Sequence, residues 1–202
     1  MKHLFFGGIH PKYNKEMSKT ILTVKTIEPK TVVIPMVQHI GAPCTPLVQV
    51  GDRVKKGQKI GDGEGLCVPV HASVSGTVVA IEPRPHVRGT NIMAVVIEND
   101  FQDELDPSIA PIDHSEMSPE AMIECIRKAG IVGHGGAAFP THIKLSLREP
   151  AKVDTLCINI AECEPYITCD DRLMQDKNRE IVEGLRLVLQ LFPNAQGIIA
   201  IE

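Results

Sequence analysis

The sequence predicts an α+β protein with more than one domain, in which a small all-β domain precedes the beginning of an α/β domain. Between residues 31 and 99, short runs rich in Val and Ile alternate with turn residues, a pattern typical of small all-β domains. After residue 118, the strand and helix segments follow in β-α-β order, which indicates a parallel pair of strands. The polar segment 100–117, which contains Pro107 and Pro111, is the predicted linker.

Residues 1–30 are predicted to form an irregular N-terminal arm. Gly7, Gly8 and Pro11 interrupt regular structure, and residues 12–19 are polar. The alternative to a functional role is that this arm merely packs across another domain.

The all-β domain, residues 31–99, is expected to hold strands at 31–35, 46–48, 53–54, 59–61, 68–70, 76–81 and 92–98. Two runs resemble the barrel-sandwich hybrid of biotinyl and lipoyl domains: Val50-Gly-Asp-Arg-Val-Lys-Lys-Gly-Gln-Lys-Ile60 and Val74-Ser-Gly-Thr-Val78. A carrier domain of that kind needs a lysine at a hairpin tip, and here the tip reads Gly61-Asp-Gly-Glu-Gly-Leu-Cys67. Because this tip has no lysine, we expect no lipoyl or biotin group and a use in docking or spacing.

The α/β segment, residues 118–202, opens with a predicted helix that leads into a glycine-rich loop. Ser118 is expected to cap the helix and Gly130 to end it. Four glycines fall within seven residues: Gly130, Gly133, Gly135 and Gly136. Backbone of this composition lets a flat or anionic ligand approach its amides closely, and Pro140 then fits the start of a short helix at 141–145. The alternative is a tight connection between two helices that binds nothing.

A buried strand is predicted at 152–160, and polar side chains follow where it stops. These are Asn159, Glu162 and Glu164. Ligands of open α/β sheets sit at the carboxyl ends of strands, so we expect the two carboxylates to serve ligand binding and to contribute little to packing. The alternative is a solvated turn. Helices at 170–174 and 178–192 and a strand at 197–201 complete the pattern.

Two motifs in this region resemble the flavin and NADH site of the 51 kDa subunit of respiratory complex I and its relatives. They are Gly133-x-Gly-Gly-Ala-x-Phe-Pro-Thr-x-x-Lys144 and Asn159-x-x-Glu-x-Glu-Pro165. Within that superfamily, the start Gly7-Gly-Ile-His-Pro11 and the run Ala161-Glu-Cys-Glu-Pro-Tyr-x-Thr-Cys-Asp-Asp-Arg172 are most similar to the C subunit of the Rnf electron-transport complex. His134 and Ala161 depart from the complex I pattern, which has an arginine and an aspartate there.

The resemblance implies an NAD-linked oxidoreductase subunit that binds FMN and NAD(H) and needs no catalytic nucleophile of its own. In that family a nicotinamide cofactor passes hydride to FMN, which releases electrons singly to iron–sulfur clusters. By resemblance, Gly133, Gly135 and Gly136 approach the nucleotide, Phe139 borders the nicotinamide, Lys144 supplies a cation, and Asn159, Glu162 and Glu164 line the flavin or nicotinamide face.

The resemblance also implies membership in an ion-translocating complex at the cytoplasmic side of the cell membrane, with the other subunits as partners and ferredoxin as an indirect one. Because the chain stops inside the strand at 197–201, we expect an N-terminal fragment of a longer protein. Two [4Fe-4S] clusters are expected only in the missing part. The fragment alone is expected to be inactive and to bind FMN weakly or not at all.

Amino-acid composition argues against three other kinds of protein or site: a nucleic-acid-binding surface, a membrane span and a metal site. A formal charge of −4 and 3% aromatic residues argue against a nucleic-acid surface. No apolar run reaches the 18 residues of a membrane span. The six cysteines include no Cys-x-x-Cys pair, so we expect reduced thiols and no metal site, with Cys157 buried in its strand as a small hydrophobe.

Two other assignments within the superfamily stay open. One is a flavin-free structural subunit similar to the A subunit of the sodium-pumping NADH:quinone reductase. The other is a cobalamin reductase of bacterial microcompartments. The intact glycine loop and acidic motif favour the flavin-binding assignment.

Overall fold

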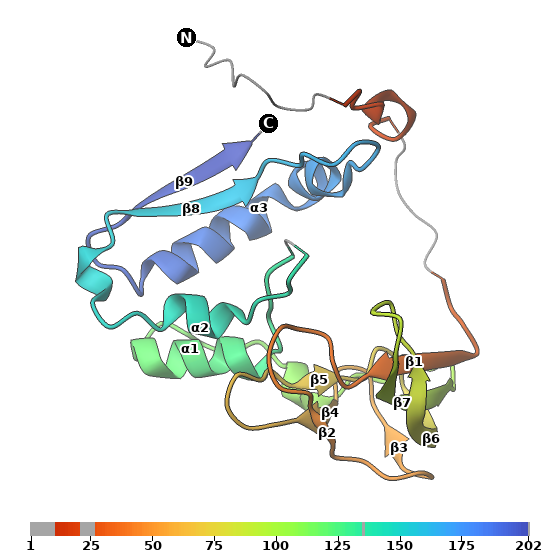
Figure 1. Ribbon diagram of the computed structural model, residues 1–202. Coiled ribbons are helices and arrows are strands. Elements are labelled where there is room, and N and C mark those ends of the chain that lie inside the picture. The colour runs from red at the N-terminus through yellow and green to blue at the C-terminus, as the bar shows by residue number, and fades with distance from the viewer. Residues whose placement is uncertain (1–10, 21–26, 135, 202) are drawn as a thin grey trace. The chain divides into compact units, whose positions relative to one another are not determined.

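The computed structural model describes residues 11–20, 27–134 and 136–201 (Figure 1). The predicted features at Gly7 to His10 and at Gly135 lie outside the described residues. The chain divides into two compact units, which are described separately below. Residues 26–147 form the barrel unit, and residues 1–25 together with 148–202 form the sheet unit.

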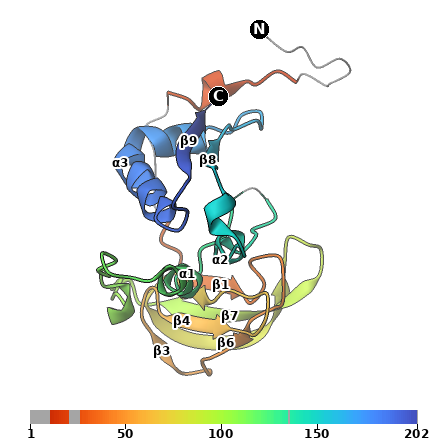
Figure 2. The same ribbon diagram turned by 90° about the vertical axis from the view of Figure 1, so that its left-hand side faces the viewer.

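The barrel unit contains two antiparallel sheets (Figure 2). The first has the order β1-β7-β6-β3, formed by β1 (Thr31–Pro35), β7 (Asn91–Asn99), β6 (Gly76–Pro85) and β3 (Arg53–Val54). The second has the order β2-β4-β5, formed by β2 (Thr45–Pro46), β4 (Lys59–Asp62) and β5 (Val70–His71). All seven predicted strands are therefore confirmed, with shifted ends for most. β6 and β7 run longer than predicted because their pairing continues to Pro85 and Asn91.

Side chains from both sheets meet in one apolar core. Val54, Ile60, Val78 and Ile97 are nearly or fully buried there, and each comes from a different strand. Burial of such side chains contributes about 1.5–3 kcal/mol each, which makes this core the main source of stability in the barrel unit.

Helix α1 (Pro119–Lys128) packs within the barrel unit, together with α2 (Thr141–Leu145). Ser118 caps α1 through its hydroxyl, which accepts from the Ala121 N–H at 3.2 Å, as predicted. The Arg127 guanidinium joins α1 to β4 by an ion pair with Asp62 at 3.2 Å.

The segment 100–117 is also tied to the barrel. The Asp106 N–H donates to the Lys56 carbonyl at 2.9 Å, and Asp106 caps the 3-10 helix η2 (Pro107–Ile109). The compact units thus do not coincide with the predicted domains, because the predicted linker and α1 pack with the barrel.

The sheet unit contains a parallel pair of strands and one long helix. β8 (Thr155–Ile160) pairs in parallel with β9 (Gln196–Ile201), which confirms the predicted pairing. Helix α3 (Cys169–Leu189) packs against both strands (Figure 1). Non-helical backbone at Lys177 kinks α3 into two helical parts, which confirms the two helices predicted on either side of residues 175–177. Short 3-10 helices, η1 (Lys15–Met17) and η3 (Pro150–Lys152), complete the unit.

The prediction of a buried Cys157 was wrong. Its side chain is exposed, as is that of Asn159 two residues further on. Successive side chains of a strand point to opposite faces, so these two share one face of β8. Ile160, which belongs to the opposite face of β8, is buried. In the described residues, no helix is long and apolar enough to cross a lipid bilayer.

Candidate functional site

The glycine loop between α1 and α2 is closed at its base by backbone pairing. Val132 and Pro140 form a bridge, and the Gly133 N–H donates to the Phe139 carbonyl at 2.8 Å. The Thr141 N–H donates to the Ile131 carbonyl at 3.1 Å. Backbone contacts therefore hold the base of the loop in place at residues 131–133 and 139–141.

Two of the glycines lie in different surroundings. Gly130 has φ +71°, and a Cβ there would lie 2.8 Å from the Pro69 carbonyl oxygen. This glycine is needed for helix termination and for close packing, as expected for the residue after a helix end. Gly136 has φ +84°, but a Cβ there would meet no atom within 4 Å. The tip of the loop is thus open at Gly136, which leaves room for a ligand.

Lys144 and Phe139 lie beside this loop. The Lys144 Nζ is 5.9 Å from the centre of the Phe139 ring, within the range of a cation–π contact. The same Nζ lies 2.6 Å from the place where a Gly133 Cβ would be. Absence of a side chain at Gly133 thus lets the ammonium reach the base of the loop. Gly133, Phe139 and Lys144 are brought together as a local group.

The two predicted carboxylates in the turn after β8 lie in different environments. Glu164 is exposed, whereas the Glu162 side chain is only 7% exposed. The Asn159 Oδ1 accepts from the Ala161 N–H at 3.1 Å, which shapes the turn. The expectation that both carboxylates contribute little to packing is therefore wrong for Glu162.

Glu162 connects the turn to the start of α3. Its Oε1 accepts from the Asp170 N–H at 3.1 Å and from the Cys169 Sγ at 2.9 Å. This satisfies one of the backbone donors left unpaired at a helix N-terminus, where negative charge is also favoured. The Glu162 Oε2 is buried and has no hydrogen-bond partner among the described residues.

Electrostatics keeps Glu162 ionised. Burial opposes its charge, but the hydrogen bonds from Cys169 and the Asp170 N–H, with the nearby Lys15 ammonium, outweigh burial and lower its pKa. The same hydrogen bond to the carboxylate, with some burial, raises the pKa of Cys169. At neutral pH the pair is a carboxylate and a protonated thiol.

The N-terminal arm contacts this turn, and the motifs of the sequence did not predict that contact. The Lys15 ammonium donates to the Glu162 carbonyl oxygen. The Tyr166 N–H donates to the Tyr13 carbonyl at 2.8 Å, and the Ser18 hydroxyl donates to the Tyr166 carbonyl at 2.8 Å. The one available signal was opposite charge, since the arm is rich in lysine and the turn is acidic.

A pocket of about 280 Å³ lies where the arm meets the turn and α3. Its lining residues include Tyr13, Lys15, Lys19, Glu162 and Thr168. The lining, which also includes Asp171, thus contains two ammonium groups, two carboxylates and the hydroxyls of Tyr13 and Thr168. Neither lysine was a predicted site residue.

The predicted site residues fall into two groups. Gly133, Gly136, Phe139 and Lys144 belong to the barrel unit, and Asn159, Glu162 and Glu164 belong to the sheet unit. Gly135 lies outside the described residues.

Comparison with protein families matches both parts of the chain. Residues 3–102 match the RnfC barrel sandwich hybrid domain, and residues 126–202 match the Nuo51 FMN-binding domain. These matches confirm the predicted fold class, a barrel-sandwich hybrid followed by the start of an α/β FMN-binding domain.

Individual relatives agree with the family matches. The chain is 48% identical over 205 residues to the C subunit of the Na(+)-translocating ferredoxin:NAD(+) oxidoreductase complex of Acetobacterium woodii, covering 100% of this chain and 46% of that protein. It is 45% identical over 201 residues to the C subunits of the ion-translocating oxidoreductase complexes of Actinobacillus succinogenes and Salmonella newport. Those alignments cover 98% of this chain but only 28% and 27% of the two proteins. The chain spans less than half the length of these curated relatives, and it belongs to the RnfC family, the C subunits of ion-translocating oxidoreductase complexes.

Proposed function

We propose that this chain supplies part of an FMN and NAD(H) site in an RnfC-type subunit, which passes electrons between a nicotinamide cofactor and iron–sulfur clusters. The match of residues 126–202 to an FMN-binding domain supports this, because both candidate elements lie within that range. The observation that carries the proposal is the open glycine loop with the Lys144 ammonium at its base.

The loop has the chemistry that a phosphorylated nucleotide requires. The Gly133 amide is already bonded to the Phe139 carbonyl, so the amides proposed to meet a ligand are those of His134 and residues 136–138. No side chain blocks approach at Gly136. The Lys144 ammonium provides positive charge for a phosphate, and a charged hydrogen bond of that kind is worth about 1.5–3 kcal/mol.

The acidic turn offers hydrogen-bond acceptors, which complement the amide donors and positive charge of the glycine loop. The buried Glu162 Oε2 is an acceptor without a partner among the described residues, and such a group is costly unless a ligand or water pairs with it. Its lowered pKa keeps it an acceptor at neutral pH. Asn159 and Glu164 add an exposed amide and carboxylate. Together these groups fit the hydroxyl and amide hydrogens of a nucleotide.

The bound cofactor would supply the redox chemistry, since a flavin accepts electrons as a pair and releases them one at a time. The chain's own residues would bind the nucleotide, orient it and balance its charge. The proposed partners are the other subunits of a membrane-associated complex, two [4Fe-4S] clusters and, indirectly, ferredoxin. The name of the Acetobacterium woodii relative, a ferredoxin:NAD(+) oxidoreductase complex subunit, supports the other subunits and ferredoxin. The two clusters are proposed from the resemblance alone.

The test uses the complete subunit purified from its host, because residues 1–202 alone are expected to bind FMN weakly or not at all. We expect bound FMN in the wild type, and a rise of about 10- to 100-fold in the Kd for FMN in Lys144→Ala, since a charged hydrogen bond is lost. Lys128→Ala is the matched control, because Lys128 is an exposed lysine at the end of α1 whose ammonium lies 3.9 Å from the Glu124 carboxylate.

Two results would count against the proposal. Equal affinity for FMN in Lys144→Ala and in the control would remove Lys144 from the site. A wild-type protein that contains no flavin, but still assembles into its complex, would favour the flavin-free structural alternative.

A further inference from the structure

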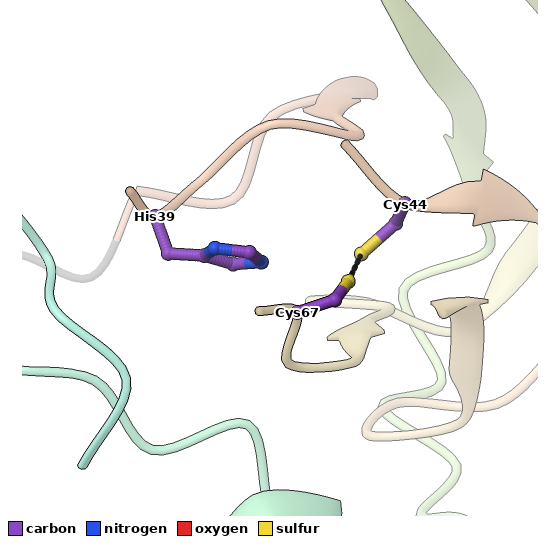
Figure 3. Close-up of side chains that lie close together, drawn as sticks. All are labelled: His39, Cys44 and Cys67. Carbon is purple, nitrogen blue, oxygen red and sulfur yellow. Dashed lines mark hydrogen bonds between the residues drawn. The ribbon is translucent and has the colours of Figure 1, made fainter. Parts of the chain in front are cut away.

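Three buried side chains converge in the barrel unit, and none of them belongs to the glycine loop. They are His39, Cys44 and Cys67, and Figure 3 shows the imidazole edge turned toward the two sulfurs. The Cys44 and Cys67 Sγ atoms are 3.2 Å apart, and one ligand atom from each of the three residues lies within 4.8 Å of the others. Their exposed fractions are 3%, 5% and 0%.

Two loops hold these side chains, and backbone contacts join the loops. His39 and Cys44 come from the loop between β1 and β2, and Cys67 from the loop between β4 and β5. The Ala42 N–H donates to the Leu66 carbonyl at 2.9 Å, and the Cys44 N–H donates to the Met36 carbonyl at 2.8 Å. The positions of the two cysteines are therefore set by the barrel, and ordering them requires no ligand.

The tautomer of His39 suits ligand binding. Its Nδ1 lies 3.1 Å from the Ile40 carbonyl oxygen, which can only accept, so Nδ1 carries the proton. The Nε2 lone pair then accepts from the Val68 N–H at 3.2 Å. A neutral imidazole whose other nitrogen is fixed by a carbonyl is the usual form of a metal-binding histidine. Binding a metal at Nε2 would exchange one weak hydrogen bond for a coordination bond.

The donor set points to a particular class of metal ion. Two thiolates and one imidazole are typical ligands of Zn²⁺, with bonds of about 2.3 Å to sulfur and about 2.0–2.1 Å to nitrogen. A tetrahedral site places two such sulfurs about 3.8 Å apart, so the observed pair needs to open by only about half an ångström. A divalent cation with two thiolates is neutral, which suits a site removed from water.

Two alternative roles for the buried cysteines explain fewer of these observations than a metal site does. Buried cysteines often act as small hydrophobes, but that role needs no histidine lone pair beside them. A disulfide would need an oxidant to reach two sulfurs that are shielded from solvent, and it would leave His39 without a role.

We propose that His39, Cys44 and Cys67 form a zinc site that joins the two loops of the barrel. On binding, each thiol loses its proton to solvent, and the two thiolates and the His39 Nε2 each donate a lone pair to the metal. The Val68 carbonyl oxygen lies 3.2 Å from the Cys44 Sγ and 3.7 Å from the Cys67 Sγ, and we assign it the fourth position. The missing Cys-x-x-Cys spacing argued against metal binding, yet these cysteines are 23 positions apart in the sequence.

Titration with Co²⁺ under reducing conditions tests the proposal in the metal-free protein. We expect thiolate-to-metal charge-transfer absorption and tetrahedral ligand-field bands that saturate at one equivalent and disappear when Zn²⁺ is added. In Cys44→Ser and Cys67→Ser the affinity should fall by at least about tenfold, since even the loss of an outer partner costs about 10–100-fold. Cys125→Ser and Cys157→Ser are the matched controls and should bind as the wild type does.

A second measurement guards against variants that fail to fold. Zn²⁺ should raise the Tm of the wild type, and a chelator should reverse the rise, without any substitution. No cobalt bands and no Tm shift in the wild type would overturn the proposal. So would a disulfide between Cys44 and Cys67, found by peptide mapping of metal-free protein purified without air. Unchanged Co²⁺ affinity in His39→Ala would overturn the three-ligand site.

Discussion

The Lys15 ammonium donates a hydrogen bond to the backbone carbonyl of Glu162, a residue 147 positions later in the chain. The same segment meets the turn again where the Tyr166 N–H donates to the Tyr13 carbonyl. The N-terminal arm therefore forms part of the wall of the candidate site, and does not only cover another part of the protein.

Replacing Lys15 should loosen the arm. In Lys15→Ala, we expect the Tyr166 amide hydrogen to exchange with solvent faster than in the wild type, because its acceptor, the Tyr13 carbonyl, is held less firmly. Hydrogen exchange followed by mass spectrometry measures this. Lys12→Ala is the control, since Lys12 is exposed. Identical exchange in both variants would show that Lys15 does not hold the arm in place.

The two carboxylates of the acidic turn should differ in their effect on stability. Glu162→Ala removes the acceptor of the Asp170 N–H at the start of α3, and loss of such a cap lowers the free energy of unfolding by about 0.5–2 kcal/mol. Glu164→Ala should change it by less than about 0.5 kcal/mol, because Glu164 is exposed. Urea denaturation of both variants is the measurement. Equal losses would mean that the bond to Asp170 contributes nothing.

The ion pair between Asp62 and Arg127 should make stability depend on pH in the acid range. Burial raises the pKa of Asp62, but hydrogen bonds from Lys59, Arg127 and the Gly63 N–H outweigh burial and lower it from 3.8 to about 2. Because the folded-state pKa is depressed, the stabilisation is fully present above pH 3.8 and is lost as pH falls toward 2. The expected size is about 2 kcal/mol.

Asp62→Asn tests this pH dependence. The variant should be less stable than the wild type at pH 7, and the difference should shrink as pH falls from about 4 toward 2. Glu149→Gln is the control, because the Glu149 and Lys152 side chains of that ion pair are 62% and 73% exposed and exposed pairs contribute little. A difference that stays constant with pH would show that the Asp62 charge is not responsible.

Two glycines with similar backbone angles should respond differently to the same substitution. Gly136→Ala at φ +84° should cost about 1–2 kcal/mol of stability from backbone strain alone, since its Cβ would meet nothing. Gly130→Ala at φ +71° adds a contact of 2.8 Å with the Pro69 carbonyl oxygen, and overpacking costs about 1–3 kcal/mol more. Thermal melts of the two variants compare these losses directly. A larger loss in Gly136→Ala would contradict the open loop tip.

Local rules in the sequence predicted the elements well. The limits of α1 were readable because the Ser118 cap and the Gly130 stop act within a few residues of the helix ends. The parallel pairing of β8 and β9 followed from the order of elements and from the limits on how a chain can cross a sheet. The motif that contains Gly136 and Lys144 identified the FMN-binding domain, because its residues lie close together in the sequence.

Contacts between distant segments were decided only by the tertiary structure. The burial of Glu162 depends on Cys169, Asp170 and Lys15, and nothing in the spacing of the acidic turn shows which carboxylate turns inward. Cys157 was expected to be buried, but the burial of a strand residue depends on which face of the sheet is covered. Cys44 and Cys67 meet because a backbone hydrogen bond between Ala42 and Leu66 holds two loops of the barrel unit together, and no local pattern of residues encodes that distance. Sequence periodicity therefore determined the secondary structure and the family motifs, whereas the pairing of side chains from separate segments required the folded barrel and sheet.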